Sequence, residues 1–213
     1  MPAHAGAWIA PEGGQRIWTE LAGERDDAFY SESSIYWEEP LGEGVAVVVA
    51  PWVTQEPQQY NLDGLRWEVT VAGKAATHRG ERSVTALQAG VVWNSDPPAD
   101  CAEAQAELRW LGGRSIGERS FVNLEAAERV GDEGCGGERV DLTLGHRFDQ
   151  RWLGMAQIFV DEPRLGDSAV KAQISLVRFG AEGRGLQVGL RARVDGGAME
   201  PALMLGFWGQ GRR

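Results

Sequence analysis

Hydrophobic and polar residues alternate one by one along most of the chain, which is the periodicity of β-strands and not of helices. The clearest stretch is 186–195, where Leu, Val, Leu, Ala and Val take every second position and Gln, Gly, Arg, Arg and Asp lie between them. Segments 65–76, 105–114 and 169–179 show the same pattern. Each segment is therefore predicted to be a strand with one apolar face and one charged face.

About twelve such segments follow one another without a linker, a low-complexity tract or a domain break. Their short connections favour an antiparallel up-and-down order over parallel crossovers. We expect a single β domain over 6–213. The strands are predicted near 16–24, 29–38, 45–54, 65–76, 83–94, 105–114, 120–130, 139–148, 152–161, 169–179, 186–195 and 201–208.

The connections form two sets that alternate along the chain. The compact set is 41–44, 78–82, 148–151 and 180–185, and the longer, acidic set is 54–64, 94–104, 131–138 and 161–168. In an up-and-down sheet the two sets lie at opposite ends of the strands. Short turns at one end and long loops at the other are typical of outer-membrane barrels.

The chain has two cysteines, Cys101 and Cys135, and they fall in consecutive long connections. The two residues are therefore expected at the same end of the sheet. An even number of cysteines suits an oxidising compartment. We predict a Cys101–Cys135 disulfide; the alternative is two separate thiols.

Two arrangements satisfy strands with one apolar and one polar face. A soluble barrel or sandwich buries the apolar face, whereas a membrane barrel turns the apolar face to lipid and lines its interior with the polar face. A tilted membrane-crossing strand needs about nine to eleven residues, as these segments have, while soluble strands average about five or six. The sequence therefore favours an all-β, up-and-down antiparallel transmembrane β-barrel of about 12 strands.

Tryptophan is abundant, with nine residues, and several lie near predicted strand ends. Indole side chains prefer the boundary between membrane and water. The predicted interface aromatics are Trp67 and Trp93 at the long-loop end, and Trp152 and Trp208 at the short-turn end. The alternative is that these are ordinary core tryptophans.

The polar faces carry charges of both signs. Inside a narrow barrel such charges must pair or be hydrated, because burying one charge alone is costly. On a soluble protein they would form a solvated surface. The predicted lumen-lining residues are Arg66, Glu68, Lys74, Glu107, Arg109, Glu125, Arg129, Asp141, Arg147, Lys171, Arg191 and Arg193.

Charge and chain termini narrow the function classes. A net charge of −10 argues against a nucleic-acid partner, which would require a basic face. Ala3-His4-Ala5 has the A-x-A form of a secretory cleavage site, with Gly6 as the first mature residue. Residues 1–5 are thus predicted to be a signal-peptide remnant; the alternative is a chance alanine-rich terminus.

The sequence shows no arrangement typical of an enzyme. Its three histidines are His4, His78 and His146, and none forms a His-x-Ser pair. Cysteine, histidine and acidic residues have no metal-ligand spacing, and no nucleotide-binding loop is present. We expect no catalytic residue, no metal and no cofactor.

Four segments resemble a family of proteobacterial outer-membrane barrels, largely without assigned function and in places labelled transporters, whose mature N-terminus is Gly-Ala-Trp. They are 6–15, starting Gly-Ala-Trp; 111–123, with Leu-Gly-Gly-Arg-Ser; 139–153; and 202–208, which ends Gly-Phe-Trp. The resemblance implies outer-membrane lipid and the barrel-assembly machinery as partners. It supplies no catalytic residues and leaves the oligomeric state open.

The expected function is an outer-membrane barrel that forms a narrow channel or transporter for small solutes or ions in a Gram-negative bacterium. One alternative is a structural or receptor barrel of the envelope without transport. Another is a soluble periplasmic β-barrel that binds a small ligand.

Overall fold

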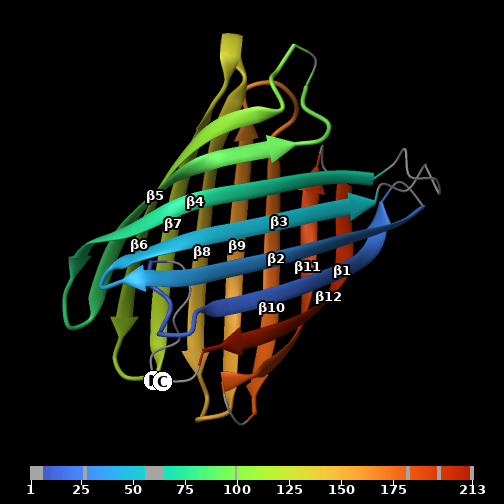
Figure 1. The fold of residues 1–213 in the computed structure, drawn as a ribbon. Coiled ribbons are helices and arrows are strands. Elements are labelled where there is room, and N and C mark those ends of the chain that lie inside the picture. The colour runs from blue at the N-terminus through green and yellow to red at the C-terminus, as the bar shows by residue number, and fades with distance from the viewer. Residues whose placement is uncertain are drawn as a thin grey trace.

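The computed structural model describes residues 7–25, 28–55, 65–98, 100–180, 183–195 and 198–211. Within these ranges twelve strands form one closed barrel, in which each strand is antiparallel to the next and β1 pairs with β12 (Figure 1). The prediction of an all-β, up-and-down antiparallel barrel is confirmed. Residues 1–5, predicted to be a signal-peptide remnant, lie outside the described ranges.

The strands are β1 Gln15–Arg25, β2 Ala28–Gly42, β3 Val45–Gln55, β4 Leu65–Arg79, β5 Ser83–Asn94, β6 Ala104–Ile116, β7 Ser120–Val130, β8 Gly136–Arg147, β9 Trp152–Pro163, β10 Ala169–Phe179, β11 Gly185–Asp195 and β12 Ala198–Gln210. A short 3-10 helix, η2 (Asp132–Gly134), precedes β8. No helix in the described part of the chain is long and apolar enough to cross a bilayer.

The strands are longer than the sequence predicted at several ends, and β2 and β4 each reach 15 residues. The additional residues lie mainly at strand ends, where alternation is weak but the backbone ladder continues. In Figure 1 the strands are strongly tilted around the barrel. Because a tilted strand crosses the hydrocarbon layer with about nine to eleven residues, these strand ends extend beyond it.

The apolar faces point outward and the polar faces point inward. On β11, Leu186, Val188 and Leu190 are exposed, whereas Gln187 between them is buried. A soluble barrel would bury the leucines and the valine instead. Ala72 on β4 is buried inside, in phase with Lys74.

The two ends of the barrel differ as the loop pattern predicted. The turns after β2, β4, β6, β8 and β10 lie at one end, the short-turn end, together with the paired residues Gln15 and Gln210. The connections that follow β5 and β7 lie at the other end, the long-loop end, where Cys101 and Cys135 are joined by a disulfide with Cα atoms 5.7 Å apart. The predicted disulfide is confirmed.

Candidate functional site in the barrel interior

The short-turn half of the interior is filled with apolar side chains. One buried cluster consists of Phe121, Leu153, Met155, Val177 and Trp208, and a second of Ala7, Val84, Ala86 and Leu111. Trp8 packs against both clusters. We did not predict this filling, although its signal is visible in the sequence, since apolar residues such as Leu153 and Val177 occupy the inward phase.

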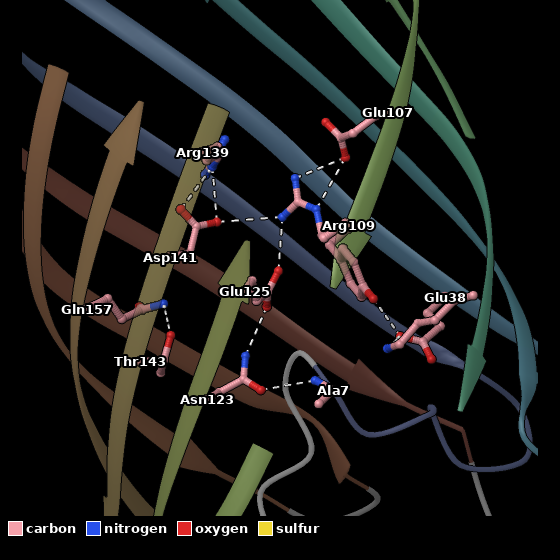
Figure 2. Close-up of polar contacts among 12 residues, drawn as sticks. Ala7, Glu38, Glu107, Arg109, Asn123, Glu125, Arg139, Asp141, Thr143 and Gln157 are labelled. Carbon is pink, nitrogen blue, oxygen red and sulfur yellow. Dashed lines mark hydrogen bonds and ion pairs between the residues drawn. The ribbon is translucent and has the colours of Figure 1, made fainter. Parts of the chain in front are cut away.

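The described part of the N-terminal segment, 7–14, enters the barrel: Ala7 and Ala10 are buried inside, whereas Glu12 and Gly13 are exposed. The Ala7 N–H donates to Asn123 Oδ1 over 3.1 Å, as Figure 2 shows, and the Ala10 N–H donates to Glu38 Oε1 over 2.8 Å. The Trp8 ring meets Phe121 edge to face, with ring centroids 6.4 Å apart. We call residues 7–14 the N-terminal plug.

A buried ion pair on the barrel wall contacts the plug. Lys74 Nζ on β4 lies 2.9 Å from Glu38 Oε2 on β2 and donates to the Trp8 carbonyl oxygen over 2.9 Å. The Tyr36 hydroxyl donates to the same Glu38 oxygen. A buried carboxylate and ammonium satisfied in this way avoid the penalty of an isolated charge, so the barrel wall and the plug stabilise each other.

On the long-loop side of the plug, Arg109 is the centre of a charged network on the inner wall. Its guanidinium contacts Glu107 at 3.1 Å, Glu125 at 2.9 Å and Asp141 at 3.6 Å (Figure 2). Asn123, whose Oδ1 accepts from the Ala7 N–H, also donates from Nδ2 to Glu125. The charged wall and the plug are therefore one hydrogen-bonded system.

The network extends around the barrel in both directions. On one side Arg129 contacts Glu107 at 2.9 Å and reaches Glu68 on β4 at 2.7 Å. On the other side Arg139 lies between Asp141 at 2.9 Å and Asp161 at 3.5 Å. Each charge on this wall thus faces an opposite charge, as the low polarity of a narrow interior requires.

A further ion pair connects strands that are not neighbours. Arg191 on β11 contacts Glu32 on β2 at 2.8 Å, although β12 and β1 lie between these strands. Arg191 also donates to Gln173 and lies over the Phe159 ring, 5.4 Å from its centroid. The pair therefore narrows the interior near the long-loop end.

Two cavities lie at the two ends of the interior. The first, about 610 Å³, is lined by Tyr36, Trp52, Arg129 and Arg191 and reaches the long-loop residue Asp167. The second, about 700 Å³, lies at the short-turn end between Trp8 of the plug and the turns that follow β2 and β4. The plug and the Glu38–Lys74 pair occupy the interior between them.

Most of the predicted lumen residues lie on the inner wall, and three have different settings. Arg66 is at the rim, where its ion pair with Asp96 is exposed. Arg147 lies near the short-turn end over the Phe179 ring, 5.0 Å from its centroid. Arg193 lines the long-loop cavity. The remaining nine are Glu68, Lys74, Glu107, Arg109, Glu125, Arg129, Asp141, Lys171 and Arg191, each in an ion pair.

Sequence reasoning missed the acidic partners Glu32, Glu38 and Asp161 and the basic residue Arg139. Glu32 and Glu38 lie on β2, where serines and adjacent glutamates blur the alternation. Asp161 ends the predicted strand and was assigned to a loop. Arg139 shares the phase of Asp141 and could have been identified from that spacing alone.

The interface prediction is wrong for Trp208. This side chain is only 6% exposed, packs on Phe179, and donates from Nε1 to Gln187 Oε1 over 2.7 Å inside the barrel. The alternation places Phe207 outward and Trp208 inward. Trp67 and Trp93 do face outward, and Trp152 lies on the outer phase beside the Arg178 guanidinium.

One histidine meets a serine, a contact that the sequence did not predict. His146 Nδ1 lies 2.8 Å from Ser120 Oγ at the short-turn end, on the outer surface. The ring also contacts Phe148, and no carboxylate of the described chain orients it as an acyl-transfer triad requires. Among the side chains that the structure describes, no group of three or more His, Cys, Asp or Glu is arranged to hold a metal ion.

No protein-family model and no curated protein matches this chain. Its fold is similar to solved outer-membrane barrels. The KdgM porin matches with TM-score 0.64 and 7% identity, over 93% of this chain and 99% of that one. The COG4313 outer membrane channel from Pseudomonas putida F1 has TM-score 0.66 and 9% identity, over 97% and 98%. The β domain of the Bordetella autotransporter BrkA has TM-score 0.53 and 13% identity, over 94% and 100%.

Proposed function

We propose that this chain is a narrow, gated channel for small polar solutes or ions in the outer membrane of a Gram-negative bacterium. The observation that supports it is the order of features along the barrel axis. A cavity opens at the long-loop end. It is followed by the ion-paired wall around Arg109, and then by the N-terminal plug, which side-chain hydrogen bonds hold in place. Residues 7–14 belong to no strand, so they can leave the interior without breaking the barrel, and a segment that changes between ordered and released states is one known kind of switch.

The outer surface supports a membrane location. Its central band is almost entirely apolar, and solved barrels of similar fold include a porin and an outer membrane channel. The resemblance to the Gly-Ala-Trp barrel family supports the same location, with membrane lipid and the barrel-assembly machinery as partners. A soluble periplasmic barrel would not expose this much apolar surface.

The charge pattern of the wall indicates the solute class. Five carboxylates of the wall, Glu68, Glu107, Glu125, Asp141 and Asp161, pair with four cations, Arg109, Arg129, Arg139 and Lys171, so this part of the wall presents no large excess of either sign. Such a surface hydrates polar solutes and exchanges hydrogen bonds with them. We propose weak selectivity between cations and anions and exclusion of bulky solutes.

A second candidate is a closed envelope barrel without transport. The apolar cluster around Phe121, Leu153 and Trp208 supports it, because those side chains belong to the wall and stay in place when the plug leaves. In this case the long-loop cavity would serve only as a surface binding site.

Planar-bilayer conductance distinguishes the two candidates. The full-length protein should show rare openings, and a variant lacking residues 7–13 should conduct persistently. Heat-dependent mobility in a detergent gel serves as the control that the barrel is intact. A silent deletion variant with an intact barrel would contradict the channel and favour the closed barrel.

A substitution at Arg109 then tests whether ions pass along this wall. Replacing Arg109 by alanine in the deletion variant leaves Glu107, Glu125 and Asp141 without their shared cation. The reversal potential in a salt gradient should move toward cation selectivity. An unchanged potential would mean that ions do not pass the Arg109 wall.

A further inference from the structure

Three polar residues of the barrel wall contact main-chain atoms of the plug. Asn123 accepts from one plug N–H at 3.1 Å (Figure 2), Glu38 accepts from another at 2.8 Å, and Lys74 donates to a plug carbonyl oxygen at 2.9 Å. These wall side chains are buried and come from β7, β2 and β4. Because every peptide carries N–H and C=O groups of this kind, the three contacts make no demand on the side chains of the segment that they hold.

The Trp8 side chain occupies a pocket in the same wall. Phe121 meets its ring edge to face, and Gly113 on β6 lies against the ring. A Cβ at Gly113 would lie 2.4 Å from Cζ3 of the indole, so no larger residue fits there while the ring is in place. We call the space between Gly113 and Phe121 the indole pocket. It suits a flat aromatic side chain.

The residues on either side of Trp8 have different surroundings. Ala7 is completely buried within one of the apolar clusters, and Ala10 is also buried, so both positions suit small side chains. Ile9 is only partly buried and lines the cavity at the short-turn end, where other side chains have room. From residue 7 to residue 10, the site is therefore matched to the side-chain order small, aromatic, variable, small.

We propose that the site of residues 7–10 is a binding site for short peptides with the order small, aromatic, variable, small, and that the plug is its intramolecular occupant. This names a solute class for the proposed channel, and it rests on the proposed function in one respect, the departure of the plug. A tethered segment competes at high effective concentration. A free peptide therefore binds only when the plug is out or has lost its anchor, and the short-turn cavity beside Trp8 gives it access.

Trp8→Ala in the full-length protein tests the competition, because it keeps the plug but empties the indole pocket. The probe is the peptide acetyl-Ala-Trp-Ile-Ala-amide, which carries the two N–H groups, the carbonyl and the indole that the wall contacts. Isothermal titration calorimetry in detergent micelles measures its affinity. The variant should bind the probe at least about tenfold more tightly than the parent protein does. Equal affinities, or no binding to the variant, would overturn the proposal.

Two altered peptides test the ligand class on the Trp8→Ala protein. With glutamine in place of isoleucine, the affinity should stay within about threefold, because the wall reads the main chain at this position and leaves room for the side chain. With alanine in place of tryptophan, it should fall about tenfold or more, because the indole pocket stays empty. A site that rejects the glutamine peptide, or that accepts the alanine peptide equally well, would refute this ligand class.

Gly113→Ala, added to Trp8→Ala, closes the indole pocket to the peptide without striking the plug, whose own ring is absent. Binding of the probe should be lost, while the barrel keeps its heat-dependent gel mobility. The matched control is Gly73→Ala in the same background, because a Cβ there meets nothing within 4 Å. That control should bind the probe as Trp8→Ala does. Unchanged binding in the Gly113 variant would place the peptide elsewhere and overturn the proposal.

Peptide binding and conductance are measured separately, so the two proposals can fail separately. A Trp8→Ala protein that conducts but does not bind the probe would overturn the peptide site and leave the channel in place. A silent barrel that binds the probe through Gly113 would support the peptide site and contradict the channel.

Discussion

Lys74 and Glu38 form an ion pair that is closed to solvent, with Nζ 2.9 Å from Oε2 and side-chain exposures of 0% and 2%. The pair joins β4 to β2 across the intervening β3 and contacts the plug through Trp8 and Ala10. Neither residue can lose its partner without leaving a group of high hydration energy inside the barrel. The fold and the closed state of the interior thus depend on the same two side chains.

Replacing Lys74 by methionine should lower the free energy of unfolding by about 3–5 kcal/mol, because Glu38 then stays buried without its cation. Urea unfolding followed by tryptophan fluorescence measures the loss. The matched control is Arg66→Gln, since the Arg66–Asp96 pair is exposed (54% and 55%). That control should cost less than about 1 kcal/mol. Equal losses in both variants would show that the Lys74 pair has no special role.

Gly90 and Gly73 lie on adjacent paired strands and should respond differently to alanine. A Cβ at Gly90 would lie 2.2 Å from the Val71 carbonyl oxygen, which is backbone and cannot move away, whereas a Cβ at Gly73 would meet nothing within 4 Å. Gly90→Ala should therefore destabilise the barrel by about 1–3 kcal/mol. Gly73→Ala should be neutral or slightly stabilising. Thermal unfolding of the two variants side by side gives the answer, and a tolerated Gly90→Ala would count against the register of β4 with β5.

The direction of the faces predicts the effect of a new charge. Leu190 faces outward on β11, so Leu190→Arg should cost about 2–4 kcal/mol if the residue lies near the bilayer midplane. Ser34, which lines the long-loop cavity, is the inward control, because an arginine there has a polar space to enter. Refolding yields into lipid vesicles across a urea series compare the two. If Ser34→Arg lowers the refolding yield more than Leu190→Arg does, the assignment of outward and inward faces is wrong.

The disulfide joins the β5–β6 connection to the residue that precedes β8. Cys101→Ser should abolish the difference in gel mobility between reduced and oxidised protein and lower the stability of the oxidised protein by about 2–4 kcal/mol, given the 34-residue separation. Cys135→Ser should give the same loss, and the double variant should lose no more than either single one. Additive losses would mean that each cysteine acts alone.

Local sequence was sufficient to predict the strands and the end of the barrel at which each connection lies. In 186–195 every second residue is apolar, and the structure places β11 at Gly185–Asp195 with those residues outward. The alternation of compact and long connections predicted that Cys101 and Cys135 lie at the same end of the barrel. Both inferences depend only on the period of a strand and on chain reversal at each turn.

The contents of the interior depended on contacts that no local pattern encodes. Residues 7–14 have no strand periodicity, yet they fill the short-turn half because Asn123, Glu38 and Lys74 converge there from β7, β2 and β4. The inward turn of Trp208 and the Ser120–His146 contact likewise depend on where distant strands meet. Such convergence exists only after the sheet has closed.

The sequence by itself determined that this chain forms strands, how many, in what order, and which face of each is apolar, because these properties repeat every two residues. Only the tertiary structure decided which charges pair across the barrel and that the N-terminal segment enters it. Closure of the barrel pairs residues from near the two ends of the chain, such as Gln15 and Gln210. The physical reason is that pairing and burial of charges are properties of that three-dimensional neighbourhood, and strand periodicity carries no information about it.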